Sequence, residues 1–373
     1  MKSLRKALVV GGGIGGMCAA IELRKRGVEV DLVELDPAWQ VYGAGITISG
    51  PTLRAFRAVG VLDRIMELGW CTDGCDIALA NGTVVGQLPT PRIAGADVPG
   101  GGGIMRPVLA RILSEATRAS GTAVRLGVSF TRIDNAADAV DVTFTDGSRG
   151  TYDLVIGADG IHSRVRQAVF PDAPKPHFTG QGSWRAVVPR PGHIVRPTMF
   201  MGERQKAGVN PVSRDEMYLF FLDKRDSDAY VEPQEWPGIL RRELAEFGGL
   251  VADIRDGITP QSRIVYRPLH AVLVPPPWHA GRVVLIGDAA HATTPHLASG
   301  AGIAVEDAVV LAQELERAEI EPALRAFVAR RWERARLVVE NSIQLGRIEQ
   351  EGGAKEEHAQ LMRTSMGALL AEI

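Results

Sequence analysis

The sequence predicts an α/β protein, in which a parallel sheet flanked by helices carries an inserted antiparallel sheet and is followed by further helices. Three observations predict this fold. A short apolar strand at residues 8–10 runs into a glycine-rich turn and a helix. Two later apolar strands, at 151–156 and 283–286, also end at Gly/Asp turns. Residues 176–279 instead contain apolar segments separated by turn residues, as consecutive antiparallel strands do.

The first forty residues carry a dinucleotide-binding fingerprint. The turn after the first strand reads Gly-Gly-Gly-Ile-Gly-Gly and opens a helix over 14–26. In such a turn Gly11 makes the bend, Gly13 lets the backbone approach a pyrophosphate, and Gly16 lets the helix pack closely on the strand. A second strand ends at Glu34, whose carboxylate would accept ribose hydroxyls and disfavour a 2′-phosphate. The sequence therefore predicts a Rossmann-like domain that holds NAD or the ADP half of FAD rather than NADP.

The later strand-to-turn motifs have the same character. Asp159-Gly160 follows the strand at 151–156, and Ser163 is predicted to cap the next helix. Gly287-Asp288 follows the strand at 283–286, and a loop rich in small residues then leads into a helix that runs to about Arg317. Helix-start N–H groups favour anionic or electron-rich atoms. Three such turns are too many for one half of a nucleotide.

The rest of the chain supplies the remaining predicted elements. Arg106 opens a helix, where a cation opposes the helix dipole; a ligand or an acidic partner would justify it, and a solvated cation is the alternative. The charged run that begins at Arg330 in the helical tail is expected to be a solvated face. Other predicted elements are a strand at 42–49, a helix at 53–59, a β-ribbon at 76–90 turning at Asn81-Gly82, paired strands at 130–134 and 140–145, and a helix at 233–247.

Composition excludes several classes of partner. The 373 residues include 42 Lys and Arg and 44 Asp and Glu, a net charge of −2, which argues against nucleic acid or an anionic membrane as the main partner. There is no apolar run long enough for an integral membrane segment and no signal-peptide pattern. The three cysteines cannot all pair and lack a metal-site spacing, so no metal is expected. We expect a reduced cytoplasmic protein, monomeric or homodimeric.

Taken together, these motifs give the chain a clear family likeness. It resembles the single-component FAD-dependent aromatic hydroxylases, the class A flavoprotein monooxygenases, and especially their salicylate-hydroxylase-like branch. Gly43-Ala-Gly45-Ile46 and the helix at Arg106 also match, and the resemblance spans the chain to about residue 345. The motifs that carry it, in order, are the Gly11–Gly16 turn with Glu34, Asp153-x3-Gly157-Ala-Asp159-Gly160-x2-Ser163-x-Val165-Arg166, and Gly287-Asp288-Ala-Ala-His291-x3-Pro295.

The resemblance implies a p-hydroxybenzoate-hydroxylase-like fold with tightly but non-covalently bound FAD. We expect a discontinuous FAD-binding domain (1–75, 100–175 and 280–320), a substrate-binding sheet lobe (76–99 and 176–279) and a C-terminal helical segment (321–373). The implied cofactor residues are Gly11, Gly13, Ile14, Gly15 and Gly16 at the pyrophosphate, Glu34 at the adenosine ribose, Gly45 in its matching stretch, Arg106 near the ribityl or pyrophosphate, Asp159 in a motif linked to FAD and NAD(P)H, Asp288 at the ribityl hydroxyls, and Pro295, Gly300, Ala301 and Gly302 beside the isoalloxazine.

The resemblance also implies the reaction. FAD would be reduced by NADH or NADPH bound transiently, since no second glycine fingerprint is present. Addition of O2 would give a flavin C4a-hydroperoxide that transfers oxygen to a small aromatic or heteroaromatic acid or phenol. Two departures from relatives matter. The loop reads Ala298-Ser299-Gly300 where relatives often have Gly-Gln-Gly or Gly-Ala-Gly, which puts the usual flavin movement in doubt; Ser49-Gly50 and the next two residues replace a frequent Pro-Asn.

Several residues are candidates for contact with the substrate. His296, beside Pro295, is predicted to be a substrate-proximal polar group, with capping of the following turn as the alternative. Thr47 is expected to face the same cavity and hydrogen-bond the substrate. Trp184 and Arg185 open the sheet lobe, and the arginine would pair with a substrate carboxylate; structural packing is the alternative for both.

Other functions stay open at the level of sequence. One is a flavin-dependent epoxidase or another ring-modifying tailoring oxygenase, including a hydroxylase of a nitrogen heterocycle. Another is a non-catalytic sensor that binds FAD or NAD. A simple NAD dehydrogenase would leave the later Asp/Gly turns without a role, and the lack of a Trp-x-Trp-x-Ile-Pro stretch argues against a flavin halogenase.

Overall fold

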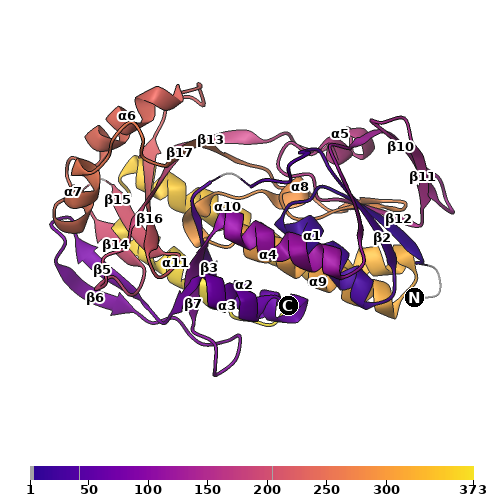
Figure 1. Cartoon of the computed structure of the whole chain (residues 1–373), viewed down its shortest axis with the longest axis horizontal. Helices are drawn as coiled ribbons and strands as arrows, with labels where there is room; N and C mark the ends of the chain where they lie inside the picture. The colour runs from indigo at the N-terminus through magenta and orange to yellow at the C-terminus, as the bar shows by residue number, and fades with distance from the viewer. Residues whose placement is uncertain (1–3, 42, 204) are drawn as a thin grey trace.

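The computed structural model describes residues 4–41, 43–203 and 205–373. Figure 1 shows a layered part, containing a parallel sheet and helix α1 (Ile14–Lys25), beside a lobe built on an antiparallel sheet. Tyr42, with which the predicted strand 42–49 begins, lies outside the described residues, and the strand is β3 (Gly45–Ser49). The mixed α/β architecture predicted from the sequence is confirmed.

A six-stranded sheet forms the centre of the layered part. Its strands, in spatial order, are β18 (His279–Ala280), β19 (Val283–Leu285), β12 (Leu154–Gly157), β1 (Lys6–Val10), β2 (Glu29–Glu34) and β8 (Ala123–Leu126). β1 pairs in parallel with β12 and β2, and β12 pairs in parallel with β19. Parallel strands point the same way, so their carboxyl ends bring Gly11, Glu34, Asp159 and Gly287 to one edge of the sheet.

Helices pack around this sheet and hold α1 in place. The long ones are α4 (Arg106–Ala119), α9 (Gly300–Arg317) and α10 (Ile320–Glu351). α1 contacts both α4 and α9, and α10 runs along α9. Every residue of α1 from Gly16 to Leu23 is buried, so this part of the helix has no solvent-facing side. This burial on all sides explains why its sequence does not alternate between an apolar and a polar face. The start of α1 is therefore fixed from several sides.

A small antiparallel sheet extends the layered part and corrects one prediction. It contains β9 (Phe130–Asn135), β10 (Val140–Phe144) and β11 (Arg149–Tyr152). The predicted pairing of 130–134 with 140–145 is confirmed. The single strand predicted at 151–156 is wrong, because the chain changes sheets at Asp153, leaving β11 in the small sheet and β12 in the large one. The Asp153 carboxylate holds this break by accepting hydrogen bonds from the backbone N–H groups of Arg5 (2.7 Å) and Lys6 (2.8 Å).

The lobe is a seven-stranded sheet whose own core is covered by helices. Its spatial order is β17 (Ile264–Ala271), β13 (His177–Pro189), β16 (Glu216–Lys224), β15 (Lys206–Pro211), β14 (Thr198–Met201), β5 (Cys75–Leu79) and β6 (Val84–Leu88). The ribbon predicted at 76–90 thus joins this sheet. The helix predicted at 233–247 is present but shorter, as a 3-10 turn, η1 (Pro233–Glu235), followed by α6 (Trp236–Glu243). A further helix, α7 (Gly249–Asp256), lies beyond the predicted range and begins at Gly249, which has φ 53°.

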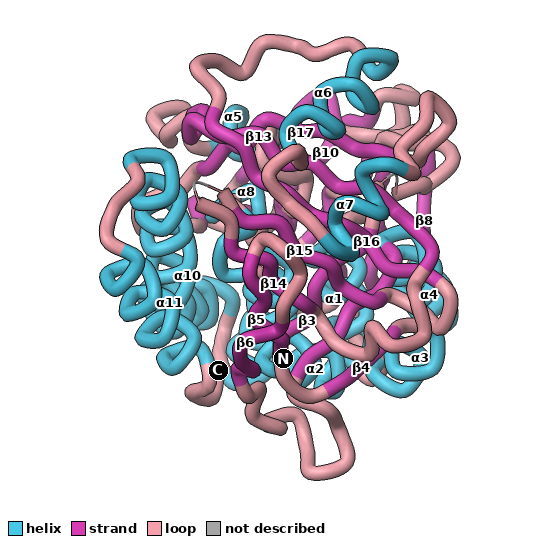
Figure 2. Tube along the Cα trace, turned by 90° about the vertical axis from the view of Figure 1, so that its left-hand side faces the viewer, coloured by secondary structure: helices cyan, strands magenta, loops and turns pink. Residues whose placement is uncertain are grey.

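Short elements connect the two parts. A three-stranded sheet of β3, β7 (Gly101–Met105) and β4 (Trp70–Thr72) lies beside α2 (Gly50–Val59) and α3 (Leu62–Leu68). Two short helices follow strands of the parallel sheet along the chain: α5 (Arg164–Val169) after β12, and α8 (Asp288–His291) after β19. The 3-10 turn η2 (Pro295–Leu297) comes next after α8. α10 and α11 (Lys355–Leu369) lie side by side in Figure 2. Within the described ranges, no helix has both the length and the hydropathy to cross a membrane.

The charged run in α10 is not the solvated face that the sequence predicted. The side chains of Glu333 and Arg336 are 69% and 41% exposed, as expected, but that of Arg331 is only 1% exposed and that of Arg334 is 11% exposed. Residues three apart share one face of a helix. Arg331 and Arg334 therefore share the face that packs against α9, where carboxylates pair with them.

Candidate functional site

The glycine-rich turn lies between β1 and α1 and is tightly constrained. Gly11 has φ 108°, and a Cβ there would lie 2.4 Å from the Ala158 carbonyl oxygen. A Cβ on Gly16 would lie 2.0 Å from the Gly11 carbonyl oxygen. Gly13 is different: it is exposed, and a Cβ there would meet nothing within 4 Å. The turn thus closes on itself at Gly11 and Gly16 and offers an open backbone at Gly13, a cradle that fits a pyrophosphate. Ile14 and Gly15, half-buried, begin α1 behind this opening.

Glu34 lies at the tip of β2, directly beside the glycine-rich turn. Its two carboxylate oxygens accept hydrogen bonds from the backbone N–H groups of Gly12 (2.7 Å) and Asp36 (2.8 Å). The Trp39 indole donates to the Gly12 carbonyl oxygen (2.8 Å), and the Arg118 guanidinium lies over the indole. The structure therefore places Glu34 in contact with the glycine-rich turn, and it adds Trp39, which the sequence motifs did not single out. A cavity of about 400 Å³ adjoins this turn, lined by Trp39, Gln40, Val41, Pro107, Ala110, Arg111 and Ser114.

Gly287 and Asp288 form the third turn at the same sheet edge. Gly287 has φ 55°, and its successor Asp288 is exposed to solvent. The region around Asp288 and the guanidinium of Arg106, whose charges act on each other, is called the hollow below. The surrounding protein raises the pKa of Asp288, an effect that His291 and Arg106 oppose. Arg166, from the second turn motif, is buried and donates to the Ala289 carbonyl oxygen (2.7 Å), which ties the second and third turns together. An acceptor carboxylate in a hollow fits the hydroxyls of a ribityl chain.

Asp159 has a structural task in the second turn. Its carboxylate accepts hydrogen bonds from the backbone N–H groups of Arg164 (2.7 Å) and Val165 (3.0 Å), and from the Ser163 hydroxyl. Ser163 in turn caps α5 by accepting from the Arg166 N–H, as predicted. Both oxygens of Asp159 are thus engaged in holding the helix start. Its influence on a bound cofactor would act through the shape of the turn.

Arg106 begins α4 and faces the hollow. It is half-buried, and among the described residues its guanidinium has neither a hydrogen bond nor an ion pair. Burial, followed by the charge of Arg185, lowers the pKa of Arg106 to about 10, while Tyr218 and Asp288 act in the opposite direction. A half-buried guanidinium without a hydrogen bond or an ion pair disfavours the fully solvated alternative and fits an anionic ligand. Gly43, with φ 144°, leaves room for the Arg106 side chain.

The loop from residue 295 to residue 302, here called the flavin loop, joins η2 to α9. Pro295 starts η2, Ala298 has φ 48°, and α9 begins at Gly300, with the Ser299 hydroxyl donating to the Leu297 carbonyl oxygen (2.7 Å). Ala301 is half-buried, and a Cβ on Gly302 would lie 2.2 Å from the Thr52 hydroxyl oxygen on α2. The flavin loop is thus packed against α2, and its amides lead into the start of an 18-residue helix.

His296 points away from the hollow and into the protein. Its side chain is fully buried; Nδ1 lies 2.9 Å from the Thr294 hydroxyl and Nε2 lies 3.3 Å from Glu349 Oε2 on α10. Glu349 also accepts from Lys206 and from His358 Nε2 (2.8 Å). This placement favours a structural role for His296, in which it fastens the flavin loop to α10. That role differs from the alternative left open by the sequence, which was capping of the following turn.

The His296–Glu349 contact predicts how stability changes with pH. Burial opposes ionisation of Glu349, but His296, His358 and Lys206 together hold the pKa of Glu349 below its ordinary value of 4.5. A carboxyl with a depressed folded pKa adds stability above its unfolded pKa and loses it as pH falls through the folded pKa. We therefore expect Glu349→Gln to be less stable than the wild type at pH 7, by about 1–3 kcal/mol. That difference should shrink as the pH falls below 4.5.

Urea unfolding at pH 7, 5.5 and 4 measures this difference. Glu351→Gln, an exposed position on the same helix, is the matched control and should follow the wild type at each pH. A Glu349→Gln deficit that stays constant from pH 7 to pH 4 would show that the carboxylate charge is not what stabilises the cluster.

Thr47 is held by two residues of the sheet lobe. Its hydroxyl lies 2.7 Å from the Tyr218 hydroxyl and accepts a hydrogen bond from Asn210 Nδ2 (2.9 Å). Thr47 is half-buried, whereas Tyr218 and Asn210 are buried behind it. Gly45, two residues earlier on the same face of β3, lies so close to the Tyr218 ring that a Cβ would come within 2.3 Å. The structure thus joins Thr47 and Gly45 to Tyr218 and Asn210, two residues for which the sequence alone gave no signal.

Trp184 and Arg185 lie on opposite faces of the lobe sheet, because neighbouring residues of a strand alternate. Trp184 is completely buried in the lobe core, stacked on Tyr266 at 4.3 Å and donating to Asp223 Oδ2 (2.9 Å). Packing, the alternative that the sequence left open, therefore describes Trp184. Arg185 is half-buried and pairs across the strands with Phe220, on the face that also carries Tyr218. Of the two, only Arg185 is placed near Arg106 and the hollow.

The fold and this edge of the sheet define a dinucleotide-binding flavoprotein of the hydroxylase type. The chain belongs to the FAD binding domain family, whose model matches residues 5–342. The resemblance to class A flavoprotein monooxygenases inferred from the motifs is confirmed.

Individual relatives agree with this assignment. The chain is 34% identical to the 2-heptyl-3-hydroxy-4(1H)-quinolone synthase of Pseudomonas aeruginosa, over 92% of this chain and 89% of that protein. It is 34% identical to the 3-amino-4-hydroxybenzoate 2-monooxygenase of Streptomyces cremeus, over 81% and 76%. Among solved structures, Klebsiella pneumoniae HpxO complexed with FAD and uric acid superimposes with a TM-score of 0.83 at 28% identity, covering 99% of this chain and 93% of that chain.

Proposed function

We propose that the protein uses FAD, NAD(P)H and O2 to hydroxylate a small aromatic or heteroaromatic acid or phenol. The observation that carries this proposal is the half-buried guanidinium of Arg106, which forms no hydrogen bond or ion pair among the described residues, although the charges of Arg185 and Asp288 both act on it. Such a cation suits an anionic partner. FAD supplies the oxygen-transfer chemistry when it is bound, by the route that the resemblance implies.

The chain's own residues would hold FAD along one edge of the parallel sheet. We propose that the open backbone at Gly13 receives the pyrophosphate, that Glu34 receives the adenosine ribose and that Asp288 receives the ribityl hydroxyls. The flavin loop would lie beside the isoalloxazine, where helix-start amides favour electron-rich atoms. The cradle that Gly11, Gly13 and Gly16 form supports this arrangement.

Substrate recognition is proposed to come from the face of the lobe sheet that carries Arg185, Tyr218 and Phe220. The Phe220 ring lies across Gly208, where a Cβ would come within 2.1 Å of it, so this face carries a flat aromatic surface. Thr47, oriented by Tyr218 and Asn210, would hydrogen-bond a ring substituent, and Arg185 would pair with an acidic group. The compounds named for the relatives are a quinolone that one of them synthesises, an aminohydroxybenzoate on which another acts, and uric acid in complex with HpxO. All three contain flat rings with polar substituents, which supports this class.

We propose domain boundaries that follow the division of the strands into sheets. The segments 1–75, 100–175 and 280–320 would form the FAD-binding domain and contain the parallel sheet. The segments 76–99 and 176–279 would form the substrate lobe, and 321–373 a helical segment packed on α9. In support, β5 and β6 join the seven-stranded sheet although β6 ends at Leu88 and the next strand of that sheet, β13, begins only at His177.

The visible spectrum and an oxidation assay test this proposal. We expect purified protein to carry FAD, and we expect a flat aromatic acid or phenol to accelerate oxidation of NADH or NADPH and to be hydroxylated. FAD binding without stimulated oxidation by any such compound would favour a non-catalytic sensor, and stimulated oxidation with an epoxide product would favour a tailoring oxygenase. A protein that binds no FAD on reconstitution would overturn the proposal.

Thr47→Val provides a sharper test of the substrate site. Valine keeps the shape of the side chain but cannot replace the hydroxyl that Tyr218 and Asn210 orient. We expect KM for the substrate to rise about tenfold, the worth of one good hydrogen bond, with FAD content unchanged. Thr131→Val, at an exposed position of β9, is the matched control and should leave KM unchanged. An unaltered KM in Thr47→Val would remove Thr47 from the substrate site.

A further inference from the structure

One buried carboxylate holds both ends of the turn that presents Asp288. Asp307 Oδ2, on α9, accepts a hydrogen bond from the Gly287 backbone N–H (2.9 Å) and lies 2.6 Å from His291 Nε2. Gly287 immediately precedes Asp288, and His291 is the last residue of α8. Asp307 and His291 are both completely buried. The position of Asp288 in the hollow is therefore set by a residue that does not itself face the hollow.

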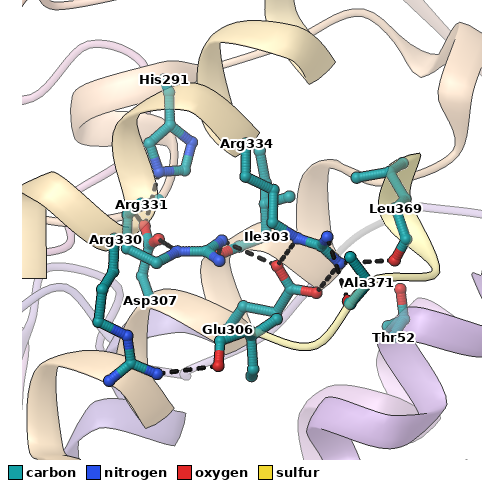
Figure 3. A network of polar contacts seen from close by, with 12 residues as sticks. Thr52, His291, Ile303, Glu306, Asp307, Arg330, Arg331, Arg334, Leu369 and Ala371 are labelled. Carbon is teal, nitrogen blue, oxygen red and sulfur yellow. Dashed lines mark hydrogen bonds and ion pairs between the residues drawn. The ribbon is translucent and has the colours of Figure 1, made fainter. Parts of the chain in front are cut away.

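Asp307 belongs to a larger buried network, shown in Figure 3. Its other oxygen accepts from Arg331 Nε (2.8 Å), and Arg331 also reaches Glu306 Oε2 (2.9 Å). The Glu306 carboxylate binds Arg334 through both of its oxygens, each at 2.7 Å. His291 Nδ1 has no hydrogen-bond partner among the described residues. The two carboxylates of Asp307 and Glu306 pair with the two guanidiniums of Arg331 and Arg334.

The network ends on the last turn of α11. Arg334 donates to the carbonyl oxygens of Leu369 (2.8 Å) and Ala371 (3.4 Å), and Arg54 of α2 donates to those of Leu370 (3.0 Å) and Ala371 (2.6 Å). Cations are favourable at the carboxyl end of a helix, where the backbone carbonyls are unpaired. A continuous chain of contacts thus links the C-terminal helix to the Gly287–Asp288 turn.

Stability alone does not account for this buried network of charged side chains. Desolvating two carboxylates and two guanidiniums is costly, and a well-packed apolar core of the same volume is often as stable or more stable. One nitrogen of Arg331, Nη1, is buried without a hydrogen-bond partner among the described residues, so the network is not even fully satisfied. What the charges do provide is a fixed orientation for the Gly287 N–H and the His291 ring.

We propose that Asp307 and Arg331 are positioning residues of the cofactor site, and that α11, through Arg334, is part of the structure that orders the Asp288 turn. Asp307 fixes the turn, Arg331 fixes Asp307, and Arg334 connects Glu306 to the end of α11. This inference rests on the proposed role of Asp288 toward FAD. It assigns a function to a charged helix that lies outside the three sequence motifs.

Two measurements on each variant test the inference: the affinity of the apoprotein for FAD and its melting temperature. Arg331→Met, which removes the charge that Asp307 and Glu306 share, should weaken FAD binding about tenfold to a hundredfold, the equivalent of one charge-assisted hydrogen bond. Asp307→Asn should weaken it similarly. The double variant Asp307→Asn/Arg331→Met, which restores the charge balance, should bind FAD more tightly than Arg331→Met. Arg336→Met, at a 41% exposed position of the same helix, is the control and should bind FAD like the wild type.

The outcomes separate the possibilities. Should Arg331→Met fail to fold, Arg334→Gln at the partly exposed edge of the network provides the same test, with a smaller expected loss of FAD affinity. Variants that melt at a lower temperature but keep the wild-type Kd for FAD would overturn the inference, because the network would then be structural only. A wild-type protein that binds no FAD would instead refute the proposed function.

Discussion

Gly16→Ala is expected to eliminate FAD from the purified protein. A Cβ at this position would lie 2.0 Å from the Gly11 carbonyl oxygen and 3.2 Å from the Ala158 Cβ. Neither neighbour can move alone, because Gly11 is itself wedged against Ala158 and held by a hydrogen bond from its N–H to the Val33 carbonyl oxygen (2.9 Å). Helix α1 would have to separate from β1. Overpacking of this kind costs about 1–3 kcal/mol or more, so the melting temperature should fall as well.

Two further glycines make this result interpretable. Gly13 has φ −75°, which alanine adopts readily, and open space around it, so Gly13→Ala should melt like the wild type yet bind FAD poorly, since its methyl group would occupy the cradle. Gly367 lies on α11 with open space around it, so Gly367→Ala should leave FAD binding unchanged and, because alanine is the better helix former, should not lower the melting temperature. FAD content by absorbance and Kd by flavin fluorescence quenching provide the measurements. Wild-type affinity in Gly13→Ala would contradict the assignment of the pyrophosphate to this turn.

Features that depend on neighbours in the chain could be predicted from the sequence. The turn at Gly11, the helix that begins at Ile14 and the serine cap at Ser163 are each fixed by a few consecutive residues. Backbone sterics and local hydrogen bonds decide such features, so the residue types carry the information. Parallel order then follows from strands that alternate with helices, which is why the sheet edge could be anticipated as the cofactor site.

Features that depend on distant partners could not be predicted. Arg331 and Arg334 look like surface residues in a charged helix, and only the packing of α10 on α9 brings them to Glu306 and Asp307. Likewise, nothing near Thr47 in the sequence points to Tyr218, and its orientation depends on the docking of the lobe. The prediction of a single strand at 151–156 was wrong for a related reason. The chain changes from one sheet to another at Asp153, but the pattern of apolar residues continues across this point and does not reveal the change.

Trp184→Ala is expected to lower the stability of the protein strongly, whereas Arg185→Ala is expected to leave it almost unchanged, although the two residues are adjacent. Trp184 fills the lobe core against Tyr266 and Phe221, and removing a fully buried side chain of this size should lower the free energy of unfolding by about 3–5 kcal/mol. Its loss would also leave Asp223 without the indole donor. The Arg185 guanidinium forms no hydrogen bond or ion pair among the described residues, and its positive charge acts unfavourably on Arg106. Its removal should change stability by less than about 0.5 kcal/mol.

In enzyme kinetics, Arg185→Ala is the variant that should show the specific effect on substrate binding. Because Arg185 is the cation of the lobe face near the hollow, Arg185→Ala should raise KM for an acidic substrate at least about tenfold, with FAD content unchanged. Arg267→Ala, an exposed arginine on the neighbouring strand β17, is the matched control and should leave KM unchanged. A loss of FAD in Arg185→Ala would instead mean that this guanidinium, like Arg106, serves the anionic part of the cofactor. The split between KM and FAD content therefore decides which anion the two arginines share, and with it whether the substrate must carry an acidic group.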